Sequence, residues 1–136
     1  MCGLLNKLFE DLIGVPYVLD GRDSKQGFDC YGLVREASRR MGYDTPDYYN
    51  PENDPSFLYA VGTKQEEYYI SLTKPEPGCI VTFRVHHNYT THIGIVLDDC
   101  DQFIHVMRNK NVCVERLHSI FWRDRITGFY KWTKSL

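Results

Sequence analysis

The chemistry of this chain is indicated first by one cysteine, Cys30, within the heptapeptide FDCYGLV at residues 28–34. A segment rich in glycine and aspartate, residues 20–27, precedes it, and a helical pattern follows. The start of a helix presents unpaired backbone N–H groups and a partial positive charge, which favour the thiolate form of a cysteine. The thiolate is the nucleophile, so this position predicts a cysteine hydrolase or acyltransferase, with Asp29 capping the helix.

A nucleophilic cysteine needs a base, and the base needs a partner that orients it. His92 opens a predicted strand and His105 lies in the next one, and the acidic turn at residues 98–101 predicts an antiparallel hairpin between them. Since side chains alternate along a strand, the two rings can lie on one face. Either histidine alone is more simply an ordinary strand residue. Together with Cys30, they predict His92 as the base and His105 as its orienting partner.

Acyl transfer also needs hydrogen-bond donors for the oxyanion of the tetrahedral intermediate. The backbone N–H of Cys30 is one candidate, and the hydroxyl of Tyr17, which precedes the glycine- and aspartate-rich segment, is a second. Simple packing beneath that segment explains Tyr17 equally well. The remaining histidines fit lesser roles: His86 and His87 suit a surface or substrate rim, and His118 is expected to take no part in the chemistry.

The other cysteines do not indicate a disulfide framework or a metal site. The chain has five cysteines, an odd number, and no pair with the C-x2–4-C spacing of zinc sites. Cys79, Cys100 and Cys113 lie in or beside apolar runs, where a free cysteine usually acts as a small buried hydrophobe. We therefore expect no bound metal and no cofactor.

Composition limits the classes of partner. The 136 residues carry a net charge of −2, so no strongly basic surface favours nucleic acid. No apolar run approaches the roughly 20 residues that cross a membrane, and no basic and apolar leader opens the chain. These features predict one domain over residues 1–136, without a signal peptide or membrane span, that is cytoplasmic as synthesised.

The elements that must position these residues begin with helices. Apolar residues recur at helical spacing over residues 4–13, and Gly14 and Pro16 end that pattern. A second helix is predicted over residues 31–41, directly after the cysteine, and Gly42 closes it.

The second half of the chain changes to strands. Residues 44–76 give weaker signals, with short helices expected within 56–61 and 64–72. After the turn at residues 75–78, short β-branched and aromatic runs predict five strands: 79–84, 91–97, 102–107, 112–117 and 126–131. N-terminal helices packed on an antiparallel sheet of about five or six strands predict an α+β fold.

With these residues in place, the chain resembles the NlpC/P60 family of papain-like cysteine peptidases. The matching blocks run in the family's order from about residue 12 to residue 106. They are GVPY at 14–17, GFDCxGLV at 27–34, PG at 77–78, HIGI at 92–95 and FIH at 103–105. The FDCxGLV and HIGI blocks together are a specific signal.

The resemblance implies a circularly permuted papain-like fold, with the nucleophile on a helix packed against an antiparallel sheet. It implies that Cys30 is the nucleophile, His92 the base and His105 the third, orienting residue, and it supports Tyr17 beside the oxyanion. Members of this family typically cleave peptide bonds in the peptidoglycan stem, often the γ-D-glutamyl link to a diamino acid. The resemblance therefore implies hydrolysis of peptidoglycan stem peptide through a thioacyl intermediate.

Departures from the family pattern affect specificity more than chemistry. Tyr31 follows the cysteine where the family usually has a small residue, so we expect its bulk, with Tyr17 and Asp29, to shape the substrate cleft. The DCYG variant, with GFY at residues 128–130, resembles the branch found among phage tail-assembly proteins. That resemblance implies a tail component that opens the periplasmic cell wall locally, with tail proteins as partners.

Two other functions fit the same residues. The triad would also serve an amidase or acyltransferase on a substrate outside the cell wall, because water and amines both resolve a thioester. Alternatively, a tail-assembly module without catalytic activity would retain these residues and use the tyrosine-rich segment 44–69 as a protein contact surface.

Overall fold

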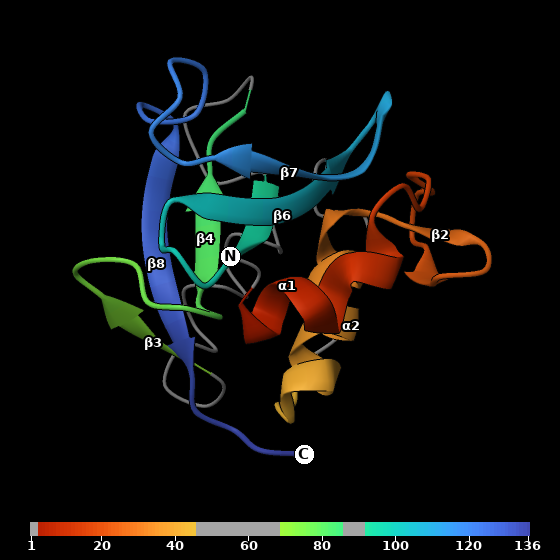
Figure 1. Cartoon of the computed structure of the whole chain (residues 1–136), viewed down its shortest axis with the longest axis horizontal. Helices are drawn as coiled ribbons and strands as arrows, with labels where there is room; N and C mark the ends of the chain where they lie inside the picture. The colour runs from red at the N-terminus through yellow and green to blue at the C-terminus, as the bar shows by residue number, and fades with distance from the viewer. Residues whose placement is uncertain (1–2, 46–68, 86–91) are drawn as a thin grey trace.

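The computed structural model describes residues 3–45, 69–85 and 92–136, and these confirm the α+β class. Its elements are α1 (Leu4–Phe9), η1 (Glu10–Leu12), β1 (Arg22–Asp23), β2 (Gly27–Phe28), α2 (Cys30–Met41), β3 (Tyr69–Leu72), β4 (Ile80–Phe83), β5 (His92–Val96), β6 (Gln102–Met107), β7 (Lys110–Arg116) and β8 (Ile126–Trp132). Six antiparallel strands form the main sheet in the order β3-β8-β4-β5-β6-β7. Helices α1 and α2 lie on one side of it, with α2 packed against β5 and β6 (Figure 1).

Helix α2 forms where the sequence predicts it and begins one residue earlier, at the cysteine. The Asp29 carboxylate accepts a hydrogen bond from the Gly32 N–H at 2.7 Å, which confirms the predicted N-cap. Gly42 ends the helix with a φ of +92°, a left-handed conformation that glycine adopts without strain. The apolar face of the helix is buried in the core: Leu33, Val34 and Ala37.

Buried residues lie on both faces of the sheet. On the helical side, Ile93 and Ile95 of β5 share one core with the apolar face of α2. On the other side, a second core contains Phe83 and Trp122. Because both faces are covered, all five residues of β5 are buried, including its first residue, His92.

Two N-terminal segments differ from the sequence prediction. Residues 20–27, expected as a loop, contribute to the small antiparallel hairpin of β1 and β2 that leads into α2. The helix predicted over residues 4–13 is divided into α1 and η1, and it ends at Leu12. Cys30, the predicted nucleophile, therefore follows an ordered hairpin rather than an irregular loop.

The sequence prediction is also wrong at residues 69–72, where the pattern predicts the end of a short helix. These residues form β3, because the ladder with residues 129–132 of β8 supplies hydrogen bonds that a helix would have to make locally. The other predicted short helix, within 56–61, lies outside the described residues. Across the described ranges, no helix is long and apolar enough to span a membrane.

Two glycines allow the β1–β2 segment to lie against the first turn of α2. A Cβ on Gly32 would overlap the carbonyl oxygen of Gly21, and a Cβ on Gly21 would overlap that of Gly27. Both neighbours are backbone atoms, which cannot swing away as a side chain can. The glycine that follows Cys30 by two residues is therefore required by the close approach of the segment before the cysteine.

We expect Gly32→Ala to destabilise the fold, although replacing glycine by alanine inside a helix usually stabilises it by about 1 kcal/mol. The added methyl group meets the Gly21 carbonyl, so the expected loss is about 1–3 kcal/mol in the free energy of unfolding, measured in urea. Arg39→Ala, on the exposed side of the same helix, is the control and should change stability by less than about 0.5 kcal/mol. A Gly32→Ala protein as stable as the parent would contradict this packing.

Candidate active site

Cys30 is the first residue of α2, and its side chain is fully buried. It belongs to the same core as Ile93, the residue that follows His92 in β5. Tyr31 is also buried in that core, so an effect of its bulk on the substrate cleft stays a prediction. The fold thus joins the start of α2 and the start of β5 through one core, and the catalytic pairing of Cys30 with His92 stays a prediction.

The carboxylate of Asp29 holds the segment before Cys30 in place. It is fully buried, and besides the Gly32 N–H it accepts hydrogen bonds from the Asp20 N–H at 3.1 Å and the Arg22 guanidinium at 2.7 Å. Burial raises the pKa of this carboxyl, and the hydrogen bond from Gly32 and the charge of Arg22 oppose the shift. Asp29 therefore ties residues 20–22 to the first turn of α2 at the residue before the cysteine, which is a positioning role.

Tyr17 is held alongside β2, next to the cysteine segment. The Val18 N–H donates to the carbonyl oxygen of Phe28 at 3.0 Å, and the Phe28 N–H donates to that of Pro16 at 3.1 Å. Tyr17 therefore pairs in parallel with Phe28, two residues before Cys30, and its hydroxyl oxygen is buried. This placement is compatible with an oxyanion donor and with simple packing, so the donor role stays a prediction.

His92 and His105 meet across the hairpin of β5 and β6. Nε2 of His92 and Nδ1 of His105 are 2.9 Å apart, and both side chains are buried. The register pairs Ile95 with Ile104, which places Gly94 opposite His105 and leaves His92 diagonal to it. A Cβ on Gly94 would stand 3.3 Å from that of His105, so the glycine of the HIGI motif leaves room for one ring to reach the other.

A carboxylate behind the histidine pair was not predicted from the sequence. Nε2 of His105 is 2.5 Å from Oε2 of Glu115 on β7, and the same oxygen accepts a hydrogen bond from Lys110 Nζ at 3.0 Å. An ionised carboxylate has no proton to donate, so His105 carries its proton on Nε2 and accepts one from His92 Nε2 at Nδ1. Nδ1 of His92 then has a free lone pair, as a general base requires.

Burial and charge keep these groups in the states just described. Burial lowers the pKa of His92 well below its usual value, and the neighbouring His105 adds to that effect. Burial also lowers the pKa of His105, while its hydrogen bond to Glu115 opposes the shift. The hydrogen bond from His105 holds the pKa of Glu115 well below its usual range, and the one from Lys110 acts in the same direction. Both rings are therefore neutral near pH 7, and Glu115 is ionised.

Aromatic rings cover the histidine pair. Trp122 is fully buried, and its ring centroid lies 5.7 Å from that of His92 and 5.1 Å from that of His105. Phe83 packs against His92 at 5.7 Å, and Phe103 packs against His105 at 4.7 Å. This apolar cover lowers the local dielectric and so strengthens the hydrogen bond between the two rings.

Two of the three cysteines that were expected to be buried, Cys100 and Cys113, are only half-buried. Cys113 is only half-buried, and it lies opposite His105 in the register of β6 and β7. Its Sγ is 3.7 Å from His105 Nε2 and 3.9 Å from Glu115 Oε2. Since residues two apart on a strand share a face, the pattern Cys113-x-Glu115 opposite a histidine was the signal available in the sequence. Cys79 is buried, as expected, whereas Cys100 is half-buried.

The remaining histidines do not join this pair in the described part of the chain. His118 is exposed, and its Nδ1 is 2.8 Å from Oδ1 of Asp101. His86 and His87 lie outside the described residues. The histidines that the structure brings together are therefore the two that the hairpin predicts.

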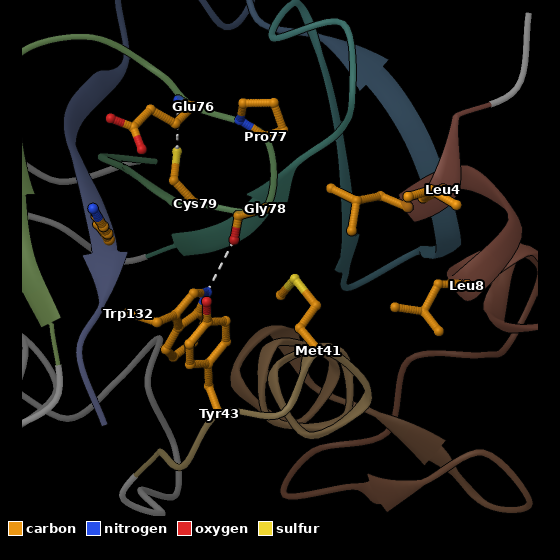
Figure 2. Close-up of a pocket in the computed structure, with 11 residues that line it drawn as sticks. Leu4, Leu8, Met41, Tyr43, Glu76, Pro77, Gly78, Cys79 and Trp132 are labelled. Atoms are coloured by element: carbon orange, nitrogen blue, oxygen red, sulfur yellow. Dashed lines mark hydrogen bonds between the residues drawn. The ribbon is translucent and has the colours of Figure 1, made fainter. Parts of the chain in front are cut away.

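An apolar hollow of about 400 Å³ lies at the other end of α2 (Figure 2). Side chains from α1, the end of α2 and β8 line it, among them Leu4, Leu8, Met41, Tyr43 and Trp132. The Trp132 indole N–H donates to the Gly78 carbonyl oxygen at 2.9 Å on its wall. The twelve residues of α2, about 18 Å, separate this hollow from Cys30. It contains none of the predicted catalytic residues and is not the candidate active site.

An α+β fold with a cysteine at a helix start and paired histidines on the sheet defines a papain-like arrangement. The model of the NlpC/P60 family matches residues 14–131, and the chain belongs to that family. The gamma-DL-glutamyl hydrolase of Bacillus subtilis (strain 168) is 30% identical to this chain over 121 residues. That match covers 88% of this chain but 26% of the relative, so the chain spans about a quarter of that hydrolase.

Solved structures share the fold. An NlpC/P60 family protein from Bacillus cereus ATCC 10987 superimposes with a TM-score of 0.71 at 17% identity, over 97% of this chain and 41% of that one. The NlpC/p60 domain of the peptidoglycan hydrolase SagA gives a TM-score of 0.63 at 23% identity, over 93% of this chain and 95% of that domain. Both likenesses confirm the predicted α+β fold.

We expect Asp29→Ala to lower the free energy of unfolding by about 3–5 kcal/mol, because it removes the buried carboxylate that caps α2 through the Gly32 N–H and pairs with the Arg22 guanidinium. Asp29→Asn should cost less, since the amide oxygen still accepts the hydrogen bond from Gly32. Urea unfolding of both variants measures the difference. A loss below about 1 kcal/mol for Asp29→Ala would show that this contact behaves as an exposed ion pair, contrary to the structure.

Proposed function

We propose that this chain is a cysteine peptidase that hydrolyses an amide bond in the peptidoglycan stem, of the γ-D-glutamyl–diamino acid type. The observation that carries the proposal is a series of hydrogen bonds that runs from Glu115 to His105 and from His105 to His92. These residues lie on the sheet against which the cysteine-bearing helix packs. Family membership supports a hydrolase, and the name of the B. subtilis relative supports a γ-glutamyl substrate.

In the proposed reaction, Cys30 is the nucleophile and His92 the base. His92 Nδ1 takes the thiol proton as Sγ attacks the carbonyl carbon, and the backbone N–H of Cys30 with the Tyr17 hydroxyl stabilises the oxyanion. His92 then gives the proton to the leaving amine, and the C–N bond breaks to leave a thioester on Cys30. Water, deprotonated by His92, hydrolyses the thioester and restores the thiol.

Glu115 and His105 serve this reaction as positioning residues. Glu115 fixes the proton of His105 on Nε2, and His105 then accepts from His92 Nε2, so the lone pair of His92 is on Nδ1. When His92 takes up the thiol proton, its Nε2–H donates to the same acceptor, and the charge is stabilised through His105 by the Glu115 carboxylate. The Glu115 carboxylate therefore acts on Cys30 only through the imidazole rings of His105 and His92.

The biological context of the proposed activity rests on the sequence predictions given above. Delivery by a phage tail, with tail proteins as partners, rests on the DCYG and GFY patterns alone. An acyltransferase or a non-wall amidase would use the same residues, and a silent module would retain them without turnover. Substrate digestion separates these functions.

We expect the chain to release products from a defined stem peptide with a γ-D-glutamyl–diamino acid bond, identified by mass spectrometry. Cys30→Ala should abolish release while the far-UV circular dichroism is unchanged, since one buried thiol contributes little to packing. Cys100→Ala, at a half-buried cysteine on the turn before β6, is the control and should keep full activity. If the stem peptides stay intact while the enzyme turns over another acyl donor, the proposed substrate is contradicted.

We expect Glu115→Gln to lower kcat by about 10–100-fold with little change in KM. The glutamine amide keeps the shape but can donate to His105 Nε2, which permits the opposite tautomer. The ¹⁵N chemical shifts of His105 should then show both tautomers instead of one. Asp101→Asn, which removes a carboxylate from the exposed His118, is the matched control and should leave kcat unchanged. An unchanged kcat with a single His105 tautomer would contradict the role of Glu115.

A further inference from the structure

Three side chains place metal-binding atoms together beside the histidine pair. Nε2 of His105, Sγ of Cys113 and Oε2 of Glu115 all lie within 4.8 Å of one another. An imidazole nitrogen, a thiolate and a carboxylate oxygen are the ligands that zinc takes in proteins. We propose that these three residues form a zinc site and that zinc bound there inhibits the enzyme; the inhibition rests on the proposed function, whereas the binding does not.

The distances fit zinc after a small adjustment. Tetrahedral coordination, with zinc–sulfur bonds of about 2.3 Å and zinc–nitrogen or zinc–oxygen bonds of about 2.0–2.2 Å, sets ligand atoms roughly 3.3–3.6 Å apart. Sγ of Cys113 already lies 3.7 Å from His105 Nε2 and 3.9 Å from Glu115 Oε2. The His105–Glu115 separation of 2.5 Å must open by about 1 Å, which the half-buried glutamate can supply by rotation. Water completes the four ligands.

The local charges and exposure permit an ion to enter. His105 is fully buried, but Cys113 and Glu115 on β7 are half-buried, so the site is reached from the β7 side. Lys110 competes for the same Glu115 oxygen at 3.0 Å. Its side chain is 50% exposed, so it can turn into solvent when the ion binds.

Zinc bound to His105 would exchange the tautomers of His105 and His92 on which the proposed mechanism depends. Zinc displaces the Nε2 proton of His105 and the thiol proton of Cys113 to solvent. His105 stays neutral by taking the proton of His92 Nε2 onto its Nδ1, and His92 takes one proton from solvent onto its own Nδ1, for a net release of one proton. With Nδ1 protonated, His92 cannot accept the proton of Cys30.

Binding is tested with Co²⁺ in the full chain carrying Cys30→Ala, so that neither activity nor the Cys30 thiol contributes. We expect a thiolate-to-cobalt charge-transfer band that saturates at one equivalent and disappears on excess Zn²⁺. The band should be lost when Cys113→Ser is added and kept when Cys100→Ser is added instead. Adding Lys110→Ala should tighten binding, because the competing ammonium is gone. A band that survives Cys113→Ser would overturn the site.

Inhibition is tested with Zn²⁺ in the chain that keeps Cys30. We expect Zn²⁺ to reduce stem-peptide hydrolysis by about 100-fold or more at saturation, and EDTA to restore it. Cys113→Ser should keep zinc-free activity and raise the inhibitory concentration by more than about tenfold, whereas Cys100→Ser should change neither. Equal inhibition of the Cys113→Ser variant would place zinc on Cys30 and His92 and overturn the proposal. An inactive chain that binds Co²⁺ through Cys113 would contradict the proposed function and not the site.

Discussion

The hydrogen bond between His92 and His105 links the fold to the proposed chemistry. It joins two buried rings at 2.9 Å, and buried polar groups of this kind are stable only when each has a partner. The β5–β6 register, the absence of a side chain at Gly94 and the cover of Trp122 all serve that one contact. Without it, Nε2 of His92 and Nδ1 of His105 would each lose the hydrogen bond that compensates for its burial beside the second core.

The cysteine side of the site depends on a different constraint, the Asp29 carboxylate. Its hydrogen bonds from Asp20, Arg22 and Gly32 fasten the β1–β2 segment to the first turn of α2. The close approach of Gly21 to Gly32 has the same effect through the backbone. The proposed nucleophile and base are therefore held by separate networks, one at the helix start and one on the sheet, and in the described residues the packing of α2 on β5 and β6 connects them.

Local patterns in the sequence predicted most of this arrangement. The heptapeptide around Cys30 indicated a capped helix, and the period-two spacing with an acidic turn indicated that His92 and His105 would meet. Glu115 and Cys113 were missed because their role depends on the register of the β6–β7 hairpin, which shifts between His105 and Met107 and was not assigned from the sequence. Trp122 lies in a segment without helical or strand pattern, and β3 forms only because β8 pairs with it across more than fifty residues of chain.

In the proposed reaction, Cys30 forms a covalent acyl intermediate with the help of His92 as base. The most direct test mixes the enzyme with a stem peptide that has a slow-reacting γ-D-glutamyl amide, quenches it in acid and measures the intact protein by mass spectrometry. We expect a mass increase equal to the acyl part of the substrate, mapped by peptide digestion to Cys30 and greatly reduced in His92→Ala. An acyl group on another residue would contradict this mechanism. So would product formation without any acyl–Cys30, together with normal turnover by the Cys30→Ala variant.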